Sequence, residues 1–447
     1  MSRIFFSGIG GSGMSAIAGF MADRGHIIAG SDRSFDTSPD NPICKIMKAK
    51  GIKIVPQDGS GINASYDFVV FSTAVEDDQP EVIKAKQLNI PIKTRPRYLS
   101  EIVSEFRTVA VAGTSGKSTM AGMLAFLMDK LGLEPNFIGG GRVKQFRTTS
   151  NPGNSLSGSS DLLVIEACES DGSIVSYQPS YSIIANLSLD HNSVEKTAEM
   201  FETLGRNTRE ALVTGGDDSN LHKCRFDNPV RFSIHTSSEY QAQAIEYQPF
   251  STNFKLHDIK FRLSLPGEYN LYNALSCMAL LSEMGIPLRD IADVLPEFSG
   301  IERRFDVYLN SGKNLVIDDY AHNPHKIESL METVKRICHR ICYIFQPHGF
   351  GPVRLMKQGY IEAFIRHLRE EDHLILLPIF YAGGSARKDI SSEDLVKEIQ
   401  AAGRSAEVLH ERRLIFSRLK EWDNYIVFGA RDETLADLAR HIAMRLK

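Results

Sequence analysis

The segment Gly113-Thr114-Ser115-Gly116-Lys117-Ser118-Thr119 decides the fold class of this chain. It follows the apolar run from Thr108 to Ala112 and opens an apolar-periodic stretch from Lys117 to Leu131, so we expect a strand, a glycine turn and a helix. Backbone N–H groups of such a turn surround phosphate oxygens, while the lysine contacts the terminal phosphates and the hydroxyl binds Mg²⁺. The segment therefore predicts an ATP site. The plain alternative is an ordinary strand-to-helix connection, because the first glycine of the usual phosphate-loop pattern is missing.

Length, charge and cysteine usage narrow the class of protein. A chain of 447 residues exceeds what one hydrophobic core usually organises, so we expect about three domains. The formal net charge of −4 gives no overall basic field, which argues against nucleic acid as a partner. The six cysteines have no paired C-x-x-C spacing, so neither a disulfide framework nor a zinc site is expected. No apolar run reaches the ~18 residues that span a bilayer, and the amino terminus runs straight into a strand, so we expect a cytoplasmic protein without a membrane partner.

The amino-terminal region reads as a nucleotide-binding unit. The run Ile4 to Ser7 predicts a strand, Gly8-Ile9-Gly10-Gly11-Ser12-Gly13 a glycine turn, and Met14 to Arg24 a helix. A second strand from His26 to Ala29 leads to Asp32, at about the separation typical of a dinucleotide fold. This G-x-G-x-x-G pattern predicts a diphosphate site, with tight helix–strand packing as the alternative.

Two more alternations of strands and helices follow. They indicate an α/β protein of three domains: a Rossmann-like domain at residues 1–106, a phosphate-loop ATPase domain with a mainly parallel sheet at 107–305, and a Rossmann-like domain at 306–447. Gly141 to Ser160, rich in Gly, Ser and Asn, is expected to be a mobile loop. The further strands predicted from apolar runs are Phe68 to Ser72, Ile92 to Thr94, Leu162 to Ile165, Ser182 to Ala185, Leu315 to Ile317, Ile341 to Phe345, His373 to Leu377 and Tyr425 to Phe428.

Polar residues at strand ends form the candidate site. Glu166 ends one predicted strand of the ATPase domain and His191 follows the next, so a carboxylate and an imidazole would share the rim with the phosphate loop and contact nucleotide-bound Mg²⁺. The alternatives are a helix cap for Glu166 or Glu169 and a surface histidine. Glu169 to Ser173 could line the same rim or form an ordinary turn. Asp319 to Pro324 stands before a helix, where it is either a ligand-binding segment or a plain polar connection.

Taken together, these motifs resemble those of the Mur ligase family, in the same order and over almost the whole chain. The segments that carry the resemblance are Gly8 to Ser15, Gly113 to Thr119, Glu166 to Asp171, Asp190-His191, Asn270 to Ala274, Arg303-Arg304-Phe305 and Asp318 to Pro324.

The resemblance implies an activity. In such an enzyme ATP phosphorylates the muramate carboxylate of a UDP-N-acetylmuramate-type sugar nucleotide, and the acyl phosphate is attacked by an amine to give the amide, ADP and phosphate, in peptidoglycan precursor synthesis. The resemblance implies ATP and Mg²⁺ as cofactors and an amino acid, first of all L-alanine, as the amine. A recycling ligase that attaches murein tripeptide is the alternative, as is a nucleotide-binding relative with another amine or none. A monomer or a homodimer is expected.

The resemblance also assigns residues to roles. Lys117, Glu166, His191 and His322 are expected to be catalytic, and Ser118, Glu166 and His191 to bind the metal. The expected ATP-binding residues are Gly113, Thr114, Ser115, Gly116, Lys117, Ser118, Thr119, Asn270, Asn273, Arg304 and Asp319. The expected substrate-binding residues are Gly10, Gly11, Ser12, Gly13, Tyr320, His348 and Arg354.

The amine substrate is where the sequence departs from the family's alanine-adding branch. Phe345-Gln346-Pro347-His348 matches that branch, but Gly349 to Arg354 follows where two arginines three apart are expected to bind the amino acid carboxylate. Arg354 is the candidate replacement for one of them. An NAD-dependent oxidoreductase would explain Gly8 to Gly13 and Asp32, but it leaves Lys117 without a role. A regulatory protein that has lost ligation would fit the altered segment.

Overall fold

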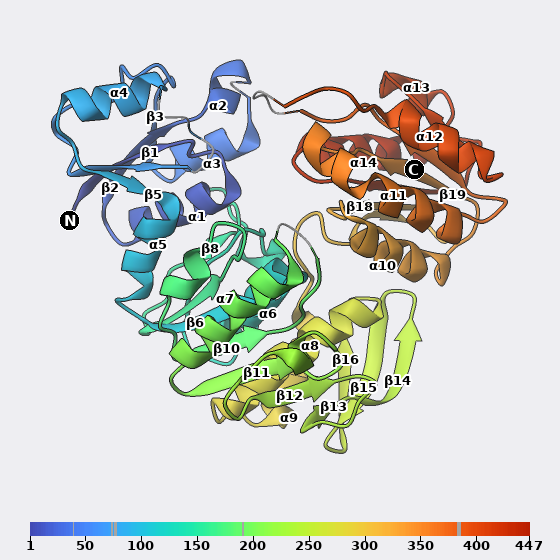
Figure 1. Ribbon diagram of the computed structural model, residues 1–447, viewed down its shortest axis with the longest axis horizontal. Coiled ribbons are helices and arrows are strands. Elements are labelled where there is room, and N and C mark those ends of the chain that lie inside the picture. Colours follow the sequence, from blue (N-terminus) through green and yellow to red (C-terminus); the bar gives the residue numbers. More distant parts are fainter. Residues whose placement is uncertain (39, 73–74, 76–77, 190–191, 382–385) are drawn as a thin grey trace. The chain divides into compact units, whose positions relative to one another are not determined.

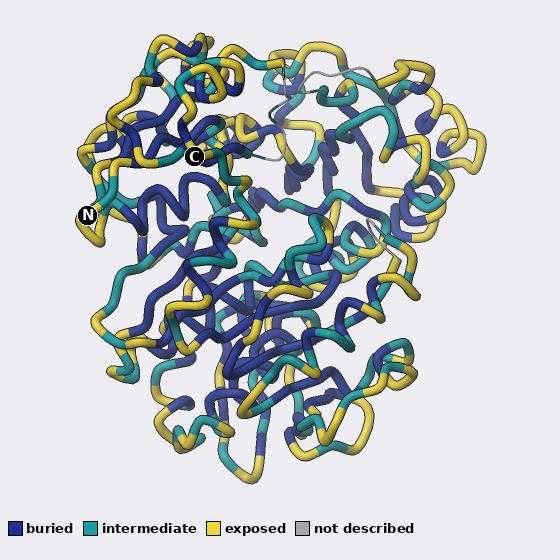
Figure 2. Tube along the Cα trace, turned by 60° about the vertical axis from the view of Figure 1, so that its left-hand side comes forward, coloured by how far each residue is buried: buried dark blue, intermediate teal, exposed yellow. Residues whose placement is uncertain are grey.

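The computed structural model describes residues 1–38, 40–72, 75, 78–189, 192–381 and 386–447. It contains two compact units, residues 1–301 and 302–447 (Figure 1). The inner strands of the parallel sheets, such as β1 (Arg3–Ser7), β6 (Arg107–Ala112) and β19 (Ile341–Phe345), are mostly buried, whereas β14 (Gln243–Gln248) has no buried position. Figure 2 shows the buried positions inside the molecule and the exposed ones at its surface. Three largely parallel sheets with helices confirm the predicted α/β class. The domain boundaries at 106/107 and 305/306 stay a prediction.

The first sheet has five parallel strands in the order β3-β2-β1-β4-β5. This order reverses direction beside β1, and ligands of such sheets bind at the carboxyl ends of the strands where the order reverses. The segment Gly8 to Gly13 follows β1 at that point, so the predicted βαβ unit is present. The strands are β1 Arg3–Ser7, β2 Ile27–Ser31, β3 Lys53–Ile54, β4 Phe68–Phe71 and β5 Ile92–Thr94, and the helices are α1 Ser12–Asp23, α2 Arg33–Thr37, α3 Pro42–Ala49, α4 Pro80–Gln87 and α5 Arg95–Val103.

The central sheet has eight strands in the order β13-β12-β11-β10-β6-β9-β7-β8, all parallel to their neighbours except β8. Because β6 lies between β10 and β9, the loops after these three strands meet at one edge. The strands are β6 Arg107–Ala112, β7 Asn136–Ile138, β8 Ser155–Leu156, β9 Leu162–Glu166, β10 Tyr181–Ile184, β11 Ala211–Gly215, β12 Val230–Ser233 and β13 Tyr240–Gln241. The helices are α6 Lys117–Lys130, α7 Val194–Asn207, α8 Glu268–Glu283 and α9 Leu288–Val294, with the 3₁₀ turns η1 Lys144–Phe146, η2 Ser173–Ser176, η3 Leu221–Lys223 and η4 Leu295–Glu297. A small antiparallel sheet consists of β14 Gln243–Gln248, β15 Ser251–Leu256 and β16 Ile259–Leu263.

Helix α6, which follows the phosphate loop, is apolar on nearly every face because protein surrounds it. Positions 119–128 are all buried, and α6 packs against both α8 and the central sheet. Each fully buried large apolar side chain contributes about 1.5–3 kcal/mol, so the base of the phosphate loop is firmly held. Among the described helices, none combines the length and apolar composition needed to cross a membrane.

The prediction of a loop at Gly141 to Ser160 is wrong for residues 144–146 and 155–156, and the mobility of the segment stays a prediction. The segment contains η1 and the strand β8, which pairs with β7. Asn154 is fully buried and donates hydrogen bonds to the Ser12 carbonyl (2.8 Å) and the Ser15 hydroxyl (2.9 Å) in α1. Composition reports only local chemistry, whereas these two partners lie far away in the sequence.

The second unit has one six-stranded sheet in the order β17-β18-β22-β19-β20-β21, parallel except for β17. The helix expected after Asp319 to Pro324 is present: α10 begins at Pro324, and Asn323 caps it. The strands are β17 Asp306–Asn310, β18 Leu315–Asp319, β19 Ile341–Phe345, β20 His373–Leu376, β21 Ala406–Val408 and β22 Asn424–Phe428, and the helices are α10 Pro324–Lys335, α11 Phe350–His367, α12 Ser392–Ala401, α13 Arg413–Phe416 and α14 Thr434–Leu446.

Gly30 on β2 gives a test of how closely the first sheet is packed. A Cβ at this position would lie 2.5 Å from the Phe6 carbonyl oxygen on β1 and 2.7 Å from the Ile9 side chain. Because backbone is in the way, Gly30→Ala is expected to destabilise the protein by roughly 1–3 kcal/mol, measured as a lower midpoint of thermal unfolding. Gly351→Ala is the control, since an added Cβ in α11 meets no atom within 4 Å. An unchanged midpoint for Gly30→Ala would contradict the packing described.

Candidate active site

The phosphate loop joins β6 to α6 as the sequence predicts. Gly113 and Gly116 have φ angles of +143° and +84°, which side-chain-bearing residues rarely adopt. A Cβ on Gly116 would also lie 2.3 Å from the Asn273 amide oxygen. Glycine at position 116 is therefore required both by the turn and by the close approach of α8.

Asn186 holds the loop in place from the neighbouring strand β10. Its amide oxygen accepts hydrogen bonds from the Ser115 N–H (2.8 Å) and the Thr114 hydroxyl (2.9 Å), and its amide nitrogen donates to the Ser115 carbonyl (3.1 Å). The Thr114 N–H donates to the Asn186 carbonyl (3.1 Å). Sequence reasoning missed this residue, although its position just past a strand beside β6 was the available signal.

Lys117 forms a partly buried ion pair with Glu169. The ammonium lies 2.9 Å and 3.1 Å from the two carboxylate oxygens and also donates to the Gly113 carbonyl. Only 2 % of the Glu169 side chain is exposed, so this carboxylate is a firmly placed internal counter-ion. The segment Glu169 to Ser173 is expected from the sequence either to line the rim of the site or to form an ordinary turn. The ion pair with Lys117 supports the rim position for Glu169.

Glu166 lies at the end of β9 and connects the phosphate loop with the turn after β7. It accepts a hydrogen bond from the Ser118 hydroxyl (3.0 Å), from the Gly141 N–H (3.2 Å) and from the Gly140 N–H. No helix of the described chain is capped by Glu166 or Glu169, so the capping alternative is not supported.

The donor set beside the loop fits Mg²⁺. Ser118 and Glu166 bring a hydroxyl and a carboxylate oxygen together, and Mg²⁺ prefers few protein oxygens plus waters and substrate phosphates. The described residues contain no group of three or more His, Cys, Asp or Glu side chains suited to a metal, which is consistent with so small a set. The third predicted ligand, His191, lies outside the described residues together with Asp190.

The two asparagines of α8 differ in their surroundings. Asn273 lies against Gly116 of the phosphate loop, whereas the Asn270 side-chain amide donates to the Pro266 carbonyl (2.7 Å). Both are buried. Their expected contact with ATP stays a prediction.

The glycine turn of the first sheet is fixed by an acid from β2. The Gly10 N–H donates to the Asp32 carboxylate (2.8 Å), and the same carboxylate caps α2 through the Ser34 N–H (2.9 Å). Helix α1 begins at Ser12 with Gly11 as its cap and has no side-chain cap or acid in its first turn. Its positive end is therefore uncompensated from within the helix, as suits a diphosphate site.

Two residues that sequence reasoning missed tie this turn to the central sheet. The Arg95 guanidinium lies 3.3 Å from the Cβ position of Gly13 and pairs with Asp171 of the central domain. Asn154 contacts Ser12 and Ser15 as described above, and its carbonyl accepts the Gly139 N–H (2.9 Å) next to the turn that Glu166 holds. The two glycine turns are thus linked within the first unit: Asn154 bonds Ser12 and Gly139, and Glu166 bonds the neighbouring Gly140 and the phosphate-loop Ser118.

The second unit gathers five of the predicted residues at the carboxyl end of β18 and β19. The Tyr320 ring lies 4.8 Å from the Arg304 guanidinium, and the His322 ring meets those of Tyr320 (5.7 Å) and His348 (5.4 Å) edge to face. The buried Asp319 carboxylate accepts the N–H groups of Phe305 and Ala321, both at 2.7 Å.

Burial controls the charges of this second group. Desolvation raises the pKa of Asp318 to about 7, although the Arg303 guanidinium, 3.0 Å away, acts in the opposite direction. Burial also lowers the pKa of His322 well below its ordinary value, helped by the charge of Lys326. Because a carbonyl only accepts, the 2.9 Å contact of His322 Nδ1 with the Tyr320 carbonyl places the proton on Nδ1. A neutral imidazole therefore has its Nε2 lone pair available.

Arg354 lies in the first turns of α11 and already has an anionic partner. Its guanidinium pairs with Asp389 and donates to the Arg387 carbonyl (3.0 Å), and its side chain is half-exposed. The predicted contact with a substrate carboxylate stays a prediction.

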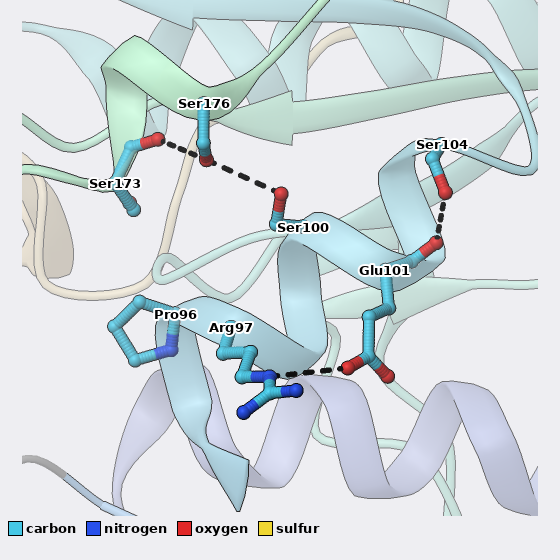
Figure 3. Close-up of a pocket in the computed structure, with 7 residues that line it drawn as sticks. All are labelled: Pro96, Arg97, Ser100, Glu101, Ser104, Ser173 and Ser176. Carbon is cyan, nitrogen blue, oxygen red and sulfur yellow. Dashed lines mark hydrogen bonds and ion pairs between the residues drawn. The ribbon is translucent and has the colours of Figure 1, made fainter.

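A pocket of about 500 Å³ between α5 and η2 does not coincide with these groups (Figure 3). Its serine hydroxyls already have partners inside the protein: Ser100 contacts Ser176 at 3.2 Å, and Ser173 donates to the Asp171 carboxylate. None of the predicted site residues lines it; the lining residues are Pro96, Arg97, Ser100, Glu101, Ser104, Ser173 and Ser176.

A phosphate loop with a lysine, a hydroxyl–carboxylate pair for Mg²⁺ and a second glycine turn on a separate sheet define an enzyme that uses ATP on a nucleotide-linked substrate. Family models agree with this class: "Mur ligase family, catalytic domain" matches residues 3–107, "Mur ligase middle domain" residues 111–281, and "Mur ligase, glutamate ligase domain" residues 303–431. The chain belongs to the Mur ligase family. It is an ATP-dependent, Mg²⁺-requiring ligase that forms a C–N bond.

Relatives match along nearly the whole chain. The UDP-N-acetylmuramate–L-alanine ligase of Caldicellulosiruptor saccharolyticus is 30% identical over 441 residues, which cover 94% of this chain and 92% of that protein. The enzyme of that name from Fusobacterium nucleatum is 30% identical over 476 residues, which cover 100% of this chain and 97% of that protein. The crystal structure of UDP-N-acetylmuramate-alanine ligase from Thermotoga maritima has a TM-score of 0.83 at 26% identity and covers 100% of this chain and 99% of that one. A murein peptide ligase structure from Psychrobacter arcticus, with a TM-score of 0.72 at 21% identity and coverage of 100% and 99%, shares the fold.

Asn186→Ala tests the support of the phosphate loop. Losing the side-chain bonds to Thr114 and Ser115 is expected to raise the KM for ATP about tenfold, since an unsatisfied partner costs roughly 1–3 kcal/mol. Steady-state kinetics measure it. Asn220→Ala is the matched control, because the Asn220 amide supports the Leu187 carbonyl (2.9 Å) and not the loop. An ATP KM equal to that of the control would remove Asn186 from the site.

Proposed function

We propose that the chain joins L-alanine to the carboxylate of UDP-N-acetylmuramate, using ATP, in the synthesis of peptidoglycan precursors. The observation that carries the proposal is the phosphate loop with Lys117, Ser118 and Glu166 around one edge of the central sheet. Similarity over nearly the full length to proteins named UDP-N-acetylmuramate–L-alanine ligase supports the choice of substrates.

The chemistry needs an activated carboxylate. A carboxylate is a poor acyl donor until one oxygen becomes a phosphate leaving group, so the γ-phosphate of ATP is transferred to it first. The amine then attacks the acyl carbon, phosphate leaves, and the amine loses a proton. Lys117 would leave Glu169 to neutralise charge on the transferred phosphoryl group. Ser118 and Glu166, with His191, would hold Mg²⁺, which supplies Lewis-acid neutralisation of phosphate charge.

The remaining predicted residues are assigned to the ligands. Gly10, Gly11, Ser12 and Gly13 would hold the sugar diphosphate at the positive end of α1. The ATP contacts would come from the whole turn from Gly113 to Thr119 with Asn270, Asn273, Arg304 and Asp319, and the amine contacts from Tyr320, His348 and Arg354. His322 would accept the proton from the amine at Nε2, because burial keeps its imidazole neutral near pH 7. The enzyme would act in the cytoplasm as a monomer or homodimer.

A murein tripeptide is the second candidate amine. Two arginines are expected to bind the carboxylate of a small amino acid. Arg354, the candidate for one of them, is already paired with Asp389. A longer peptide would depend less on one such contact.

The test of the proposed function is phosphate release from ATP with UDP-N-acetylmuramate and one amine at a time. We expect release with L-alanine and a product mass equal to the amide. Release only with murein tripeptide would move the chain to the recycling activity, and NADH formation or consumption in the same mixtures would revive the oxidoreductase alternative. Binding of both nucleotides without any amide product would contradict ligation.

Arg354→Ala tests the amine site. If Arg354 binds the carboxylate of the amine, the KM for the amine is expected to rise about tenfold or more while the KM for ATP stays the same, because a charge-assisted contact is worth roughly 1.5–3 kcal/mol. Initial rates at varied amine and varied ATP separate the two. Lys357→Ala is the control, since Lys357 stands one turn further along α11 and pairs with Glu398 at 2.6 Å. An amine KM that matches the control rejects the role.

A further inference from the structure

Glu81 is a buried carboxylate that the proposed mechanism does not use. It stands in the first turn of α4 in the amino-terminal domain, with 1% of its surface exposed. Burying a charge is costly unless hydrogen bonds compensate for it, and an apolar residue of similar size would often be as stable. The carboxylate therefore has to be explained by what it contacts.

Among the described residues, the hydroxyl groups that bond to Glu81 belong to the last residues of β1 and β2, and Gln57 is a further hydrogen-bond partner. The hydroxyls of Ser7 and Ser31 donate to the two different carboxylate oxygens of Glu81. Ser7 and Ser31 are directly paired in the parallel register of the sheet, and both are fully buried. Burial raises the pKa of Glu81, whereas the hydrogen bonds from Ser31 and Ser7 and the positive end of α4 favour the charged carboxylate. Glu81 thus joins the carboxyl ends of two adjacent strands.

The same two strand ends carry the glycine turn. The N–H groups of Gly8 and Ile9 both donate to the Ser31 carbonyl, at 2.9 Å and 3.0 Å. The next residue, Gly10, donates to Asp32, which follows Ser31. The first three residues of the turn are therefore placed by a dipeptide whose serine side chain Glu81 holds.

We propose that Glu81 is a positioning residue for the sugar nucleotide, acting through Ser7 and Ser31 to hold the turn from Gly8 to Gly13 in its binding geometry. This inference rests on the proposed function, because the ligand of that turn is taken to be the diphosphate of UDP-N-acetylmuramate. A carboxylate suits the task better than an amide, since it accepts both hydroxyls at once and fixes the two serines relative to each other. A turn that is held before the ligand arrives loses less entropy on binding.

The experiment compares Glu81→Gln with the wild type in two direct binding measurements and in kinetics. The side-chain volume is kept, but an amide cannot accept at both ends. We expect Kd and KM for UDP-N-acetylmuramate to rise about tenfold, as for the loss of one well-placed buried hydrogen bond, while Kd for ATP and kcat at saturating sugar nucleotide stay within about twofold. If Glu81 served stability alone, Glu81→Gln would lower the midpoint of thermal unfolding without raising the Kd for UDP-N-acetylmuramate more than the Kd for ATP.

Two further variants make the result decisive. Ser31→Ala keeps the carboxylate and is expected to weaken sugar nucleotide binding in the same direction, and it should add little to Glu81→Gln because both act through one contact. Asp372→Asn is the matched control: it removes a buried carboxylate in the second unit that bonds the Ile341 N–H (3.0 Å) and Arg369 (2.9 Å). It should lower stability and leave the sugar nucleotide affinity unchanged.

The outcomes separate the inference from the proposed function. Wild-type protein that does not bind UDP-N-acetylmuramate would overturn the proposed function and the inference with it. Wild-type binding with equal affinity in Glu81→Gln, or effects of Glu81→Gln and Ser31→Ala that simply add, would overturn the inference alone. Should Glu81→Gln fail to fold, Ser31→Ala still decides, because it must raise the sugar nucleotide Kd and leave the ATP Kd unchanged.

Discussion

The carboxylate of Glu166 is the contact on which the arrangement of the first unit depends. It accepts hydrogen bonds from the phosphate-loop Ser118 and from the turn at Gly140 and Gly141. Gly139, next to that turn, donates its N–H to the Asn154 carbonyl, and the Asn154 amide donates to the Ser12 carbonyl in the first turn of α1. One side chain at a strand end therefore sets the position of an ATP-binding turn, and through a short run of hydrogen bonds that of the second glycine turn. Removing it would leave three part-buried donors without this partner at once.

Several buried or part-buried cations of the protein are each paired with a carboxylate in direct contact. Lys117 has Glu169, Arg95 has Asp171, and Arg303 has Asp318, each pair at least partly buried. Such pairs add little to stability, because desolvation offsets most of the Coulomb attraction. Their value lies in geometry: each holds a long, flexible cation beside a turn or strand end where a phosphate or carboxylate of a substrate is proposed to bind.

The sequence predicted the elements well wherever a strand is buried on both faces. Runs such as Thr108 to Ala112 and Ile341 to Phe345 are apolar throughout because parallel sheets are covered on both sides, and the structure has strands there. The loop prediction for Gly141 to Ser160 was wrong where η1 and β8 form, and Asn154 in this segment bonds Ser12 and Ser15, more than 100 positions away, which composition does not encode. Of the site, the sequence located Lys117, Ser118 and Glu166 through the phosphate-loop motif and strand ends. It missed Asn186, Arg95, Asn154 and Glu81, whose roles come from contacts between elements. The left-handed backbone conformation of Arg303 and Phe305 (φ +60° and +48°) could not be predicted from the sequence either, because neither residue type indicates it.

The ion pair between Lys117 and Glu169 gives the phosphate loop a form of selectivity. A loop lysine without a counter-ion would attract any small anion, including the inorganic phosphate that is abundant in cells and is a product of ligation. With Glu169 in contact, the local charge of the pair is zero, and an incoming anion has to displace a carboxylate that is fixed in the protein. A triphosphate can do so because it also gains the backbone N–H groups of the turn and a metal ion, whereas a single phosphate gains less. The ion pair therefore favours a ligand that makes several contacts together over a single small anion.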